Sequence, residues 1–104
     1  MSSDEARRMQ AMTSICFEMI EIASGLAHLE ANINDGEISQ RNAARSAYDL
    51  YRRMTEIVNI FMEERERTAS QFLSDFYYEQ YRLATRLSDQ AQSLYSFSLT
   101  DRGY

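Results

Sequence analysis

The stretch EERERTASQ, residues 63–71, decides whether this chain forms two helices or three. Thr68 and Gln71 stand three residues apart before the apolar Phe72. This spacing is typical of a capping box, in which two side chains satisfy free backbone N–H groups where a helix begins. It predicts that one helix ends near Glu66 and that the next begins at Thr68. The opposing signs are the lack of glycine or proline here and a run of good helix formers, so one continuous helix over residues 39–98 is the alternative.

Apolar residues on both sides of this stretch recur at alternating steps of three and four, as in helices packed side by side at a shallow angle. Two such series lie in residues 4–32 and 39–66, with the first reaching one residue beyond its segment, and a third series in residues 69–98 has less regular spacing. The first is Met12, Ile15, Met19, Ile22, Leu26, Leu29 and Ile33; the second is Ala43, Ala47, Leu50, Met54, Ile57 and Phe61; the third is Leu73, Phe76, Leu83, Leu87, Ala91 and Leu94, flanked by Tyr77, Tyr81, Ala84 and Tyr95.

These series predict an all-α fold, a single domain over residues 1–104 built as an antiparallel bundle of three helices. The helices are expected at about residues 4–32, 39–66 and 69–98, followed by a short frayed tail from Leu99 to Tyr104. Their near-equal lengths favour the bundle. In the alternative, a lopsided helical hairpin must dimerise into a larger bundle to cover its apolar residues. The absence of proline and the presence of only three glycines suit either form.

The loop NINDGEIS, residues 32–39, shares its glycine with a calcium-binding EF-hand loop. With Gly36 at loop position 6, the ligand positions 1, 3 and 12 fall on Ala31, Ile33 and Asn42, which lack the required carboxylates. We therefore predict no calcium binding and a plain connection between helices. Gly36 would stop one helix in the left-handed conformation, and Ser39 would cap the next helix.

The net charge of −5 argues against a nucleic-acid partner, because phosphate contacts need surplus positive charge. All eleven basic residues are arginine, and the sequence alone does not explain the absence of lysine. No apolar run approaches the roughly 20 residues that span a bilayer. The start lacks a signal peptide and there is one cysteine, so we expect a cytoplasmic protein that does not act at a membrane.

No familiar catalytic or metal-binding pattern is present, so we predict neither a cofactor nor a metal and do not expect an enzyme. His28, the single histidine, should face solvent, and Cys16, beside the first series, should be a small buried hydrophobic residue. Glu18 and Glu21 lack the Glu-x-x-His partners of a di-iron bundle. The alternative is a small all-α enzyme or ligand binder with an arginine-lined cleft, for which the candidates are Arg41, Arg45, Arg52, Arg53, Arg82 and Arg86.

Surplus apolar and aromatic residues indicate binding to other proteins. Those off the three series are Phe17, Ile20, Ile60, Phe72 and Tyr78. On the first helix we predict a dimerisation face of Phe17, Ile20 and Ala27, and hence a homodimer. On the third helix we predict a partner-binding site of Tyr78, Arg82 and Asp75, because Tyr78 points about 100° away from Tyr77 on an ideal helix.

The predicted function is therefore protein binding. The protein would be an adaptor, a secretion-type chaperone, or a stoichiometric inhibitor or regulator encoded by a bacterium or a phage. The arginine-lined enzyme or ligand binder is one alternative, and a purely structural coiled-coil subunit is another. The identity of the partner is beyond the sequence.

Overall fold

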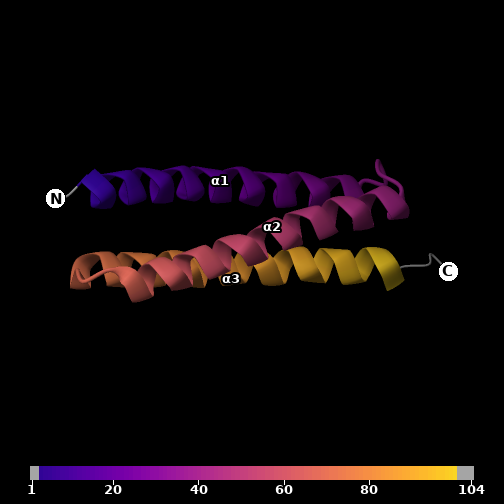
Figure 1. Cartoon of the computed structure of the whole chain (residues 1–104). Helices are drawn as coiled ribbons and strands as arrows, with labels where there is room; N and C mark the ends of the chain where they lie inside the picture. Colours follow the sequence, from indigo (N-terminus) through magenta and orange to yellow (C-terminus); the bar gives the residue numbers. More distant parts are fainter. Residues whose placement is uncertain (1–2, 101–104) are drawn as a thin grey trace.

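A computed structural model describes residues 3–100, with only the backbone described at Thr100, as three helices. The helices are α1 (Ser3–Asn34), α2 (Gln40–Arg67) and α3 (Gln71–Thr100). They run up, down and up, so α1 and α3 are parallel to each other and antiparallel to α2 (Figure 1). This confirms the all-α three-helix bundle, and every helix bound lies within two residues of the predicted one. The alternative of one helix over residues 39–98 is wrong. The predicted tail begins too early, because α3 includes residues 99 and 100; residues 101–104 lie outside the described part.

The break between α2 and α3 is made by three residues. Thr68 has extended backbone (φ −77°, ψ 138°), and its N–H donates to the Glu64 carbonyl at 3.1 Å. The Thr68 Oγ1 accepts from the Ser70 N–H at 3.2 Å, and the Ser70 Oγ accepts from the Leu73 N–H at 3.2 Å. Ser70 is therefore the residue that caps α3. The predicted capping box on Thr68 is wrong because the threonine hydroxyl closes a local turn instead, and the Gln71 side chain donates to Asp75 at 2.8 Å.

The connection between α1 and α2 is a helix-ending turn built on Gly36. Glu37 N–H donates to the Asn32 carbonyl at 2.9 Å, and Gly36 N–H donates to the Ile33 carbonyl at 3.2 Å. This pair of bonds is a Schellman motif, which requires a left-handed residue, and Gly36 has φ 69°. Ser39 then caps α2 as predicted, its side chain accepting from the Asn42 N–H at 3.1 Å. The loop is thus the predicted helix connection.

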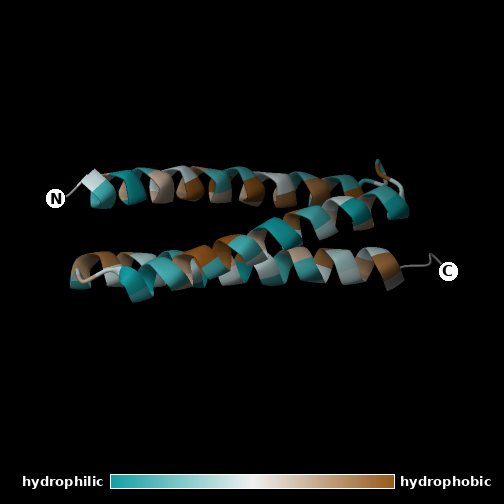
Figure 2. Ribbon diagram, viewed as in Figure 1, coloured by the Kyte–Doolittle hydropathy of each residue, from teal (hydrophilic) through white to brown (hydrophobic). Residues whose placement is uncertain are grey.

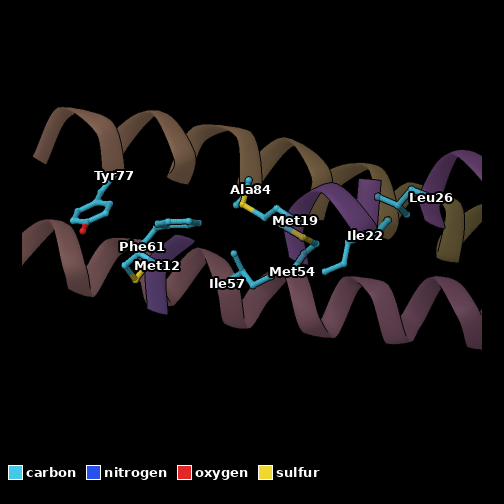
Figure 3. Close-up of a cluster of buried hydrophobic side chains, with 10 residues drawn as sticks. Met12, Met19, Ile22, Leu26, Met54, Ile57, Phe61, Tyr77 and Ala84 are labelled. Atoms are coloured by element: carbon cyan, nitrogen blue, oxygen red, sulfur yellow. The ribbon is translucent and has the colours of Figure 1, made fainter. Parts of the chain in front are cut away.

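The core runs along the middle of the bundle and takes side chains from all three helices (Figure 3). α1 contributes Met12, Met19, Ile22, Leu26 and Leu29; α2 contributes Ala43, Ala44, Ala47, Met54, Ile57 and Phe61; α3 contributes Tyr77, Ala84, Ala91 and Ser98. The first two predicted series are therefore the buried faces of α1 and α2, and burial of such side chains contributes roughly 25 cal/mol per Å² of apolar surface. Ile60, expected at the surface, packs against this core.

The third helix buries a stripe next to the predicted one. Its buried residues begin at Tyr77 and recur every seven positions through Ala84 and Ala91, whereas Phe76 and Leu83 are 42% and 38% exposed. The prediction that Phe76 and Leu83 belong to the core is wrong. Small side chains allow helix axes to approach more closely than large ones, so α3 turns its alanines towards the core and leaves the adjacent larger residues outside.

The three helices are not packed equally. Contact between α2 and α3 is the most extensive, that between α1 and α2 is much smaller, and that between α1 and α3 is the smallest. In Figure 1, α2 crosses obliquely from the end of α1 to the start of α3. The bundle is 57 Å long and 17 by 16 Å across. None of the helices within residues 3–100 combines the length and apolar character needed to cross a membrane.

Two ion pairs join α1 to α2 besides the apolar contacts. Arg8 Nη2 lies 2.8 Å from Glu64 Oε2, and Arg53 Nη2 lies 2.6 Å from Glu18 Oε1. Arg53 Nη1 also lies 2.8 Å from Glu56 Oε2 of its own helix. The hydrogen bond from Arg53 holds the pKa of the Glu18 carboxyl below its ordinary value. These two ion pairs, which the sequence analysis did not predict, therefore help to hold α1 in position against α2.

Candidate functional site

An apolar groove runs between α1 and α3 on the side of the bundle that α2 does not cover. It consists of two open hollows of about 310 and 230 Å³ that meet at Cys16. The first hollow is lined by Met9, Met12, Thr13, Cys16, Phe72, Leu73, Phe76 and Tyr77; the second is lined by Cys16, Met19, Ile20, Ala23, Gln80, Leu83 and Leu87. We refer to this set of residues as the α1/α3 groove.

Among the described residues that line the groove, none carries a formal charge. Large side chains project from it: Phe72 is 78% exposed and Ile20 is 64% exposed. Phe17, next to Cys16 on α1, is 63% exposed. The exposed apolar side chains of the groove are thus contiguous and not scattered singly over the surface, and it is contiguous apolar patches that are informative about function.

The position of the groove follows from the topology. In an up-down-up-down bundle of four helices, the first and third helices lie on a diagonal and the fourth helix fills the place between them. Here α1 and α3 are parallel, touch each other least, and are both antiparallel to α2. Figure 2 shows hydrophobic residues recurring along the side of α1 that faces the other helices. The groove therefore occupies the place of a fourth helix antiparallel to α1 and α3.

Cys16 marks the middle of the groove. Its Sγ lies 3.8 Å from Gln80 Oε1, a contact that links α1 to α3 between the two hollows. Burial raises the pKa of the Cys16 thiol above its ordinary value. Because the thiolate is the nucleophilic form, a raised pKa keeps the sulfur protonated and weakly reactive. Cys16, expected to be buried, is only partly buried, and the direction of its pKa shift agrees with the expectation of an unreactive thiol.

One end of the groove opens into a polar hollow of about 200 Å³ beside the turn between α2 and α3. The Arg8–Glu64 pair, Arg67 and the side chain of Tyr77 line it. Burial is the main cause that raises the pKa of the Tyr77 hydroxyl above its ordinary value. The apolar groove thus ends at a cluster of hydrogen-bonding groups.

Of the three predicted dimerisation residues, only Ile20 lines the groove, and their role in a dimer stays a prediction. Phe17, Ile20 and Ala27 are all exposed. The sequence did not identify Phe76 and Leu83 as the opposite wall, because their spacing fits the core equally well. Phe72 was detectable as apolar surplus, since it fell outside the third series.

The predicted partner-binding residues lie elsewhere on α3. Tyr78 is 38% exposed, its ring stacks on Tyr81 with centroids 6.1 Å apart, and the Arg65 guanidinium carbon lies 4.5 Å from the Tyr78 ring centroid. Arg82 Nη1 lies 3.7 Å from Glu79 Oε1. Asp75 is held by the Gln71 side chain. The Tyr78 ring is therefore held at the surface by its contacts with Tyr81 and Arg65. A partner-binding role for Tyr78, Arg82 and Asp75 stays a prediction.

The arginines considered for a ligand cleft do not converge on one cavity. Arg41, Arg45 and Arg52 are exposed on α2, and Arg53 is engaged by two carboxylates. Arg82 and Arg86 line a shallow hollow on α3 together with Glu79. His28 is exposed, as predicted. Over residues 3–100, no three histidine, cysteine or acidic side chains come together as a possible metal site.

Comparison with known proteins gives no relative: no protein-family model, no curated protein and no solved structure matches this chain. The α1/α3 groove is therefore the feature of the molecule from which a function can be inferred.

Proposed function

We propose that the protein acts by binding another protein and that the α1/α3 groove receives an amphipathic helix of that partner. The observation that supports this most strongly is the uncharged groove at the open fourth position of the bundle. Docking of an amphipathic helix into an apolar groove is a recurring mode of recognition, in which residues spaced three and four apart enter the groove.

The groove defines the chemistry of the helix it would take. From Met9 to Ala23 it covers fourteen steps along α1, or about 21 Å at roughly 1.5 Å per residue. A partner helix of about four turns matches that length. Its buried stripe should carry apolar residues only, because a charge in an uncharged, desolvated groove has no counter-ion and costs several kcal/mol. Its polar face would remain in solvent.

This mode of binding serves an adaptor, a secretion-type chaperone and a stoichiometric inhibitor or regulator equally well, because each recognises a segment of a larger protein. The surface around Tyr78 would be a second contact for a partner that extends beyond its docked helix. Tyrosine and arginine are the residues most enriched among interface hot spots.

A pair of matched charge substitutions tests the proposal. Purified Ile20→Glu, Met62→Glu and wild-type protein are each used to recover binding proteins from an extract of the native host. Ile20 lines the groove, whereas Met62 is a comparably exposed apolar residue on α2 that does not line it. We expect Ile20→Glu to lose a stoichiometric partner that wild type and Met62→Glu both retain.

The recovered partner is then examined by calorimetry with a peptide of its predicted amphipathic helix. We expect the peptide to bind wild type and to bind Ile20→Glu at least about tenfold more weakly, equivalent to 1.4 kcal/mol. Equal recovery by Ile20→Glu and Met62→Glu, or a peptide that binds all three proteins alike, would contradict the proposal.

A further inference from the structure

We propose that the α1/α3 groove is closed by a second copy of the chain until a partner helix displaces it. In this dimer the helices of the two copies are antiparallel, and Ile20 and Phe72 of each copy enter the hollows of the other. The regulatory part of this inference rests on the proposed function, whereas the dimer itself does not.

The distribution of charge favours the α1/α3 groove as the face at which two copies meet. Each chain carries a net charge of −5, so two copies repel each other over most of their surfaces. The described residues that line the groove are uncharged. Apposition of two grooves therefore buries apolar surface without bringing like charges face to face, which would cost free energy at an interface.

The level of Cys16 and Gln80 is the natural position of a two-fold axis, because the two hollows meet there. We place the axis in the plane of the interface, perpendicular to the helices. Ile20 lies four residues after Cys16 and Met12 lies four residues before it, about 6 Å to either side. The rotation therefore sets Ile20 of one copy at the level of Met12 in the other, over the larger hollow.

The same rotation also brings different levels along α3 of the two copies together. Phe72 lies eight residues before Gln80 and Leu87 lies seven residues after it, about 12 and 11 Å from the axis. Phe72 of one copy thus arrives at the level of Leu87 in the other, over the smaller hollow. The two projecting side chains of each copy meet the two hollows of its partner, as an isologous interface requires. A parallel pair would instead keep each side chain at its own level, where Ile20 meets the hollow that it already lines.

The interface in such a dimer is small. The groove covers about 21 Å of α1 at roughly 1.5 Å per residue on a bundle 16 Å wide, which is less than the roughly 800 Å² per partner of a standard interface. A contact of this size suits a dimer that a partner helix can separate. In such a dimer the groove is covered, and a partner helix binds only after the copies separate. The apparent affinity for the partner is therefore the affinity of the monomer multiplied by the fraction of chains that are monomeric.

Sedimentation of four proteins at micromolar concentration tests the dimer without a partner. Wild type and Met62→Glu should sediment as dimers, and Ile20→Glu and Phe72→Glu should dissociate at least about tenfold more readily. All four should keep the same helical circular dichroism, because the three substituted side chains are exposed. A variant that loses its helical signal is replaced by the alanine change at the same position, which should weaken the dimer less.

Cys16 reports the arrangement of the copies, because the axis places both Cys16 side chains in the covered interface. A maleimide should therefore modify Cys16 at least about tenfold more slowly in wild-type dimers than in Ile20→Glu or Phe72→Glu. Wild type that sediments as a monomer, dimers that persist in both groove variants, or Cys16 that reacts equally fast in wild-type dimers and in the groove variants would overturn the inference. A monomeric wild type leaves the proposed helix binding intact, whereas unaltered partner binding by Ile20→Glu removes that function and leaves the dimer.

Discussion

Two neighbouring stripes on α3 differ in the size of their residues and in what covers them. One stripe begins at Tyr77, continues through Ala84 and Ala91, and is buried in the core. The other stripe contains Phe72, Phe76 and Leu83, which are exposed and line the α1/α3 groove. The two stripes are turned from each other by only part of the helix circumference, yet one is fully used by the fold and the other is not.

The difference shows that hydropathy alone does not decide which apolar face a small bundle buries. The close contact of α2 with α3 requires small side chains on α3, and the two alanines supply them. The phenylalanines would remove more apolar area from water if they were buried, but none of the helices described within residues 3–100 buries them. Large apolar residues therefore remain exposed on α3 beside its buried alanines.

The largest expected effect is on stability, in a comparison of a buried phenylalanine with an exposed one. Phe61 is fully buried and its ring centroid lies 6.3 Å from that of Tyr77, whereas Phe72 is mostly exposed. We expect Phe61→Ala to lower the free energy of unfolding by about 3–5 kcal/mol through the cavity it leaves. Phe72→Ala should change it by less than about 0.5 kcal/mol in the monomer. Urea denaturation at concentrations below dimerisation measures both values, and equal losses would show that the two stripes are not distinct.

Enlarging a buried alanine tests whether α2 and α3 must approach each other closely. Ala84 is fully buried, so Ala84→Leu must force side chains or helices apart and should cost about 1–3 kcal/mol of stability. Ala27→Leu serves as the control, because Ala27 is exposed on α1. Thermal unfolding compares the two variants. A stable Ala84→Leu protein would mean that α3 does not depend on a small residue at this position.

The third prediction concerns the weaker attachment of α1. The Arg53 hydrogen bond lowers the pKa of the Glu18 carboxyl, so this pair stabilises the fold above the unfolded pKa of about 4.3. The contribution is lost as the pH falls through the lower folded pKa. Both side chains are about one-third exposed, which limits the effect to less than about 1 kcal/mol. Urea denaturation from pH 6 to pH 3, at about one-unit steps, should show a smaller loss for Glu18→Gln than for wild type, and parallel losses would contradict the pairing.

The sequence predicted the helices well because their ends and apolar spacing are local properties. Gly36 and Ser39 act through their own neighbours, and the break at residues 68–70 was visible as a polar stretch even though the capping residue was misassigned. The first two buried series were also readable, since each helix offered one series of strongly apolar residues.

The orientation of α3 and the groove could not be predicted in the same way. Phe76 and Leu83 match the spacing of a core as well as Tyr77 and Ala84 do, and only the approach of α2 distinguishes them. The salt bridges of Arg8 with Glu64 and of Arg53 with Glu18 join residues far apart in the chain, so no local pattern reveals them. The surplus of Phe17, Ile20 and Phe72 was the one signal that apolar surface remained.

Photo-crosslinking from the groove in the native host tests the central claim most directly. A benzophenone amino acid is placed at Phe72, which projects from the groove, and at Met62 as the control position on α2. We expect the benzophenone at position 72 to crosslink to an amphipathic helix, either of a second copy or of a partner protein. We expect the benzophenone at position 62 to give no such crosslink. Crosslinks of equal yield and identity from both positions, or none from position 72, would contradict the claim that the α1/α3 groove is a helix-binding site.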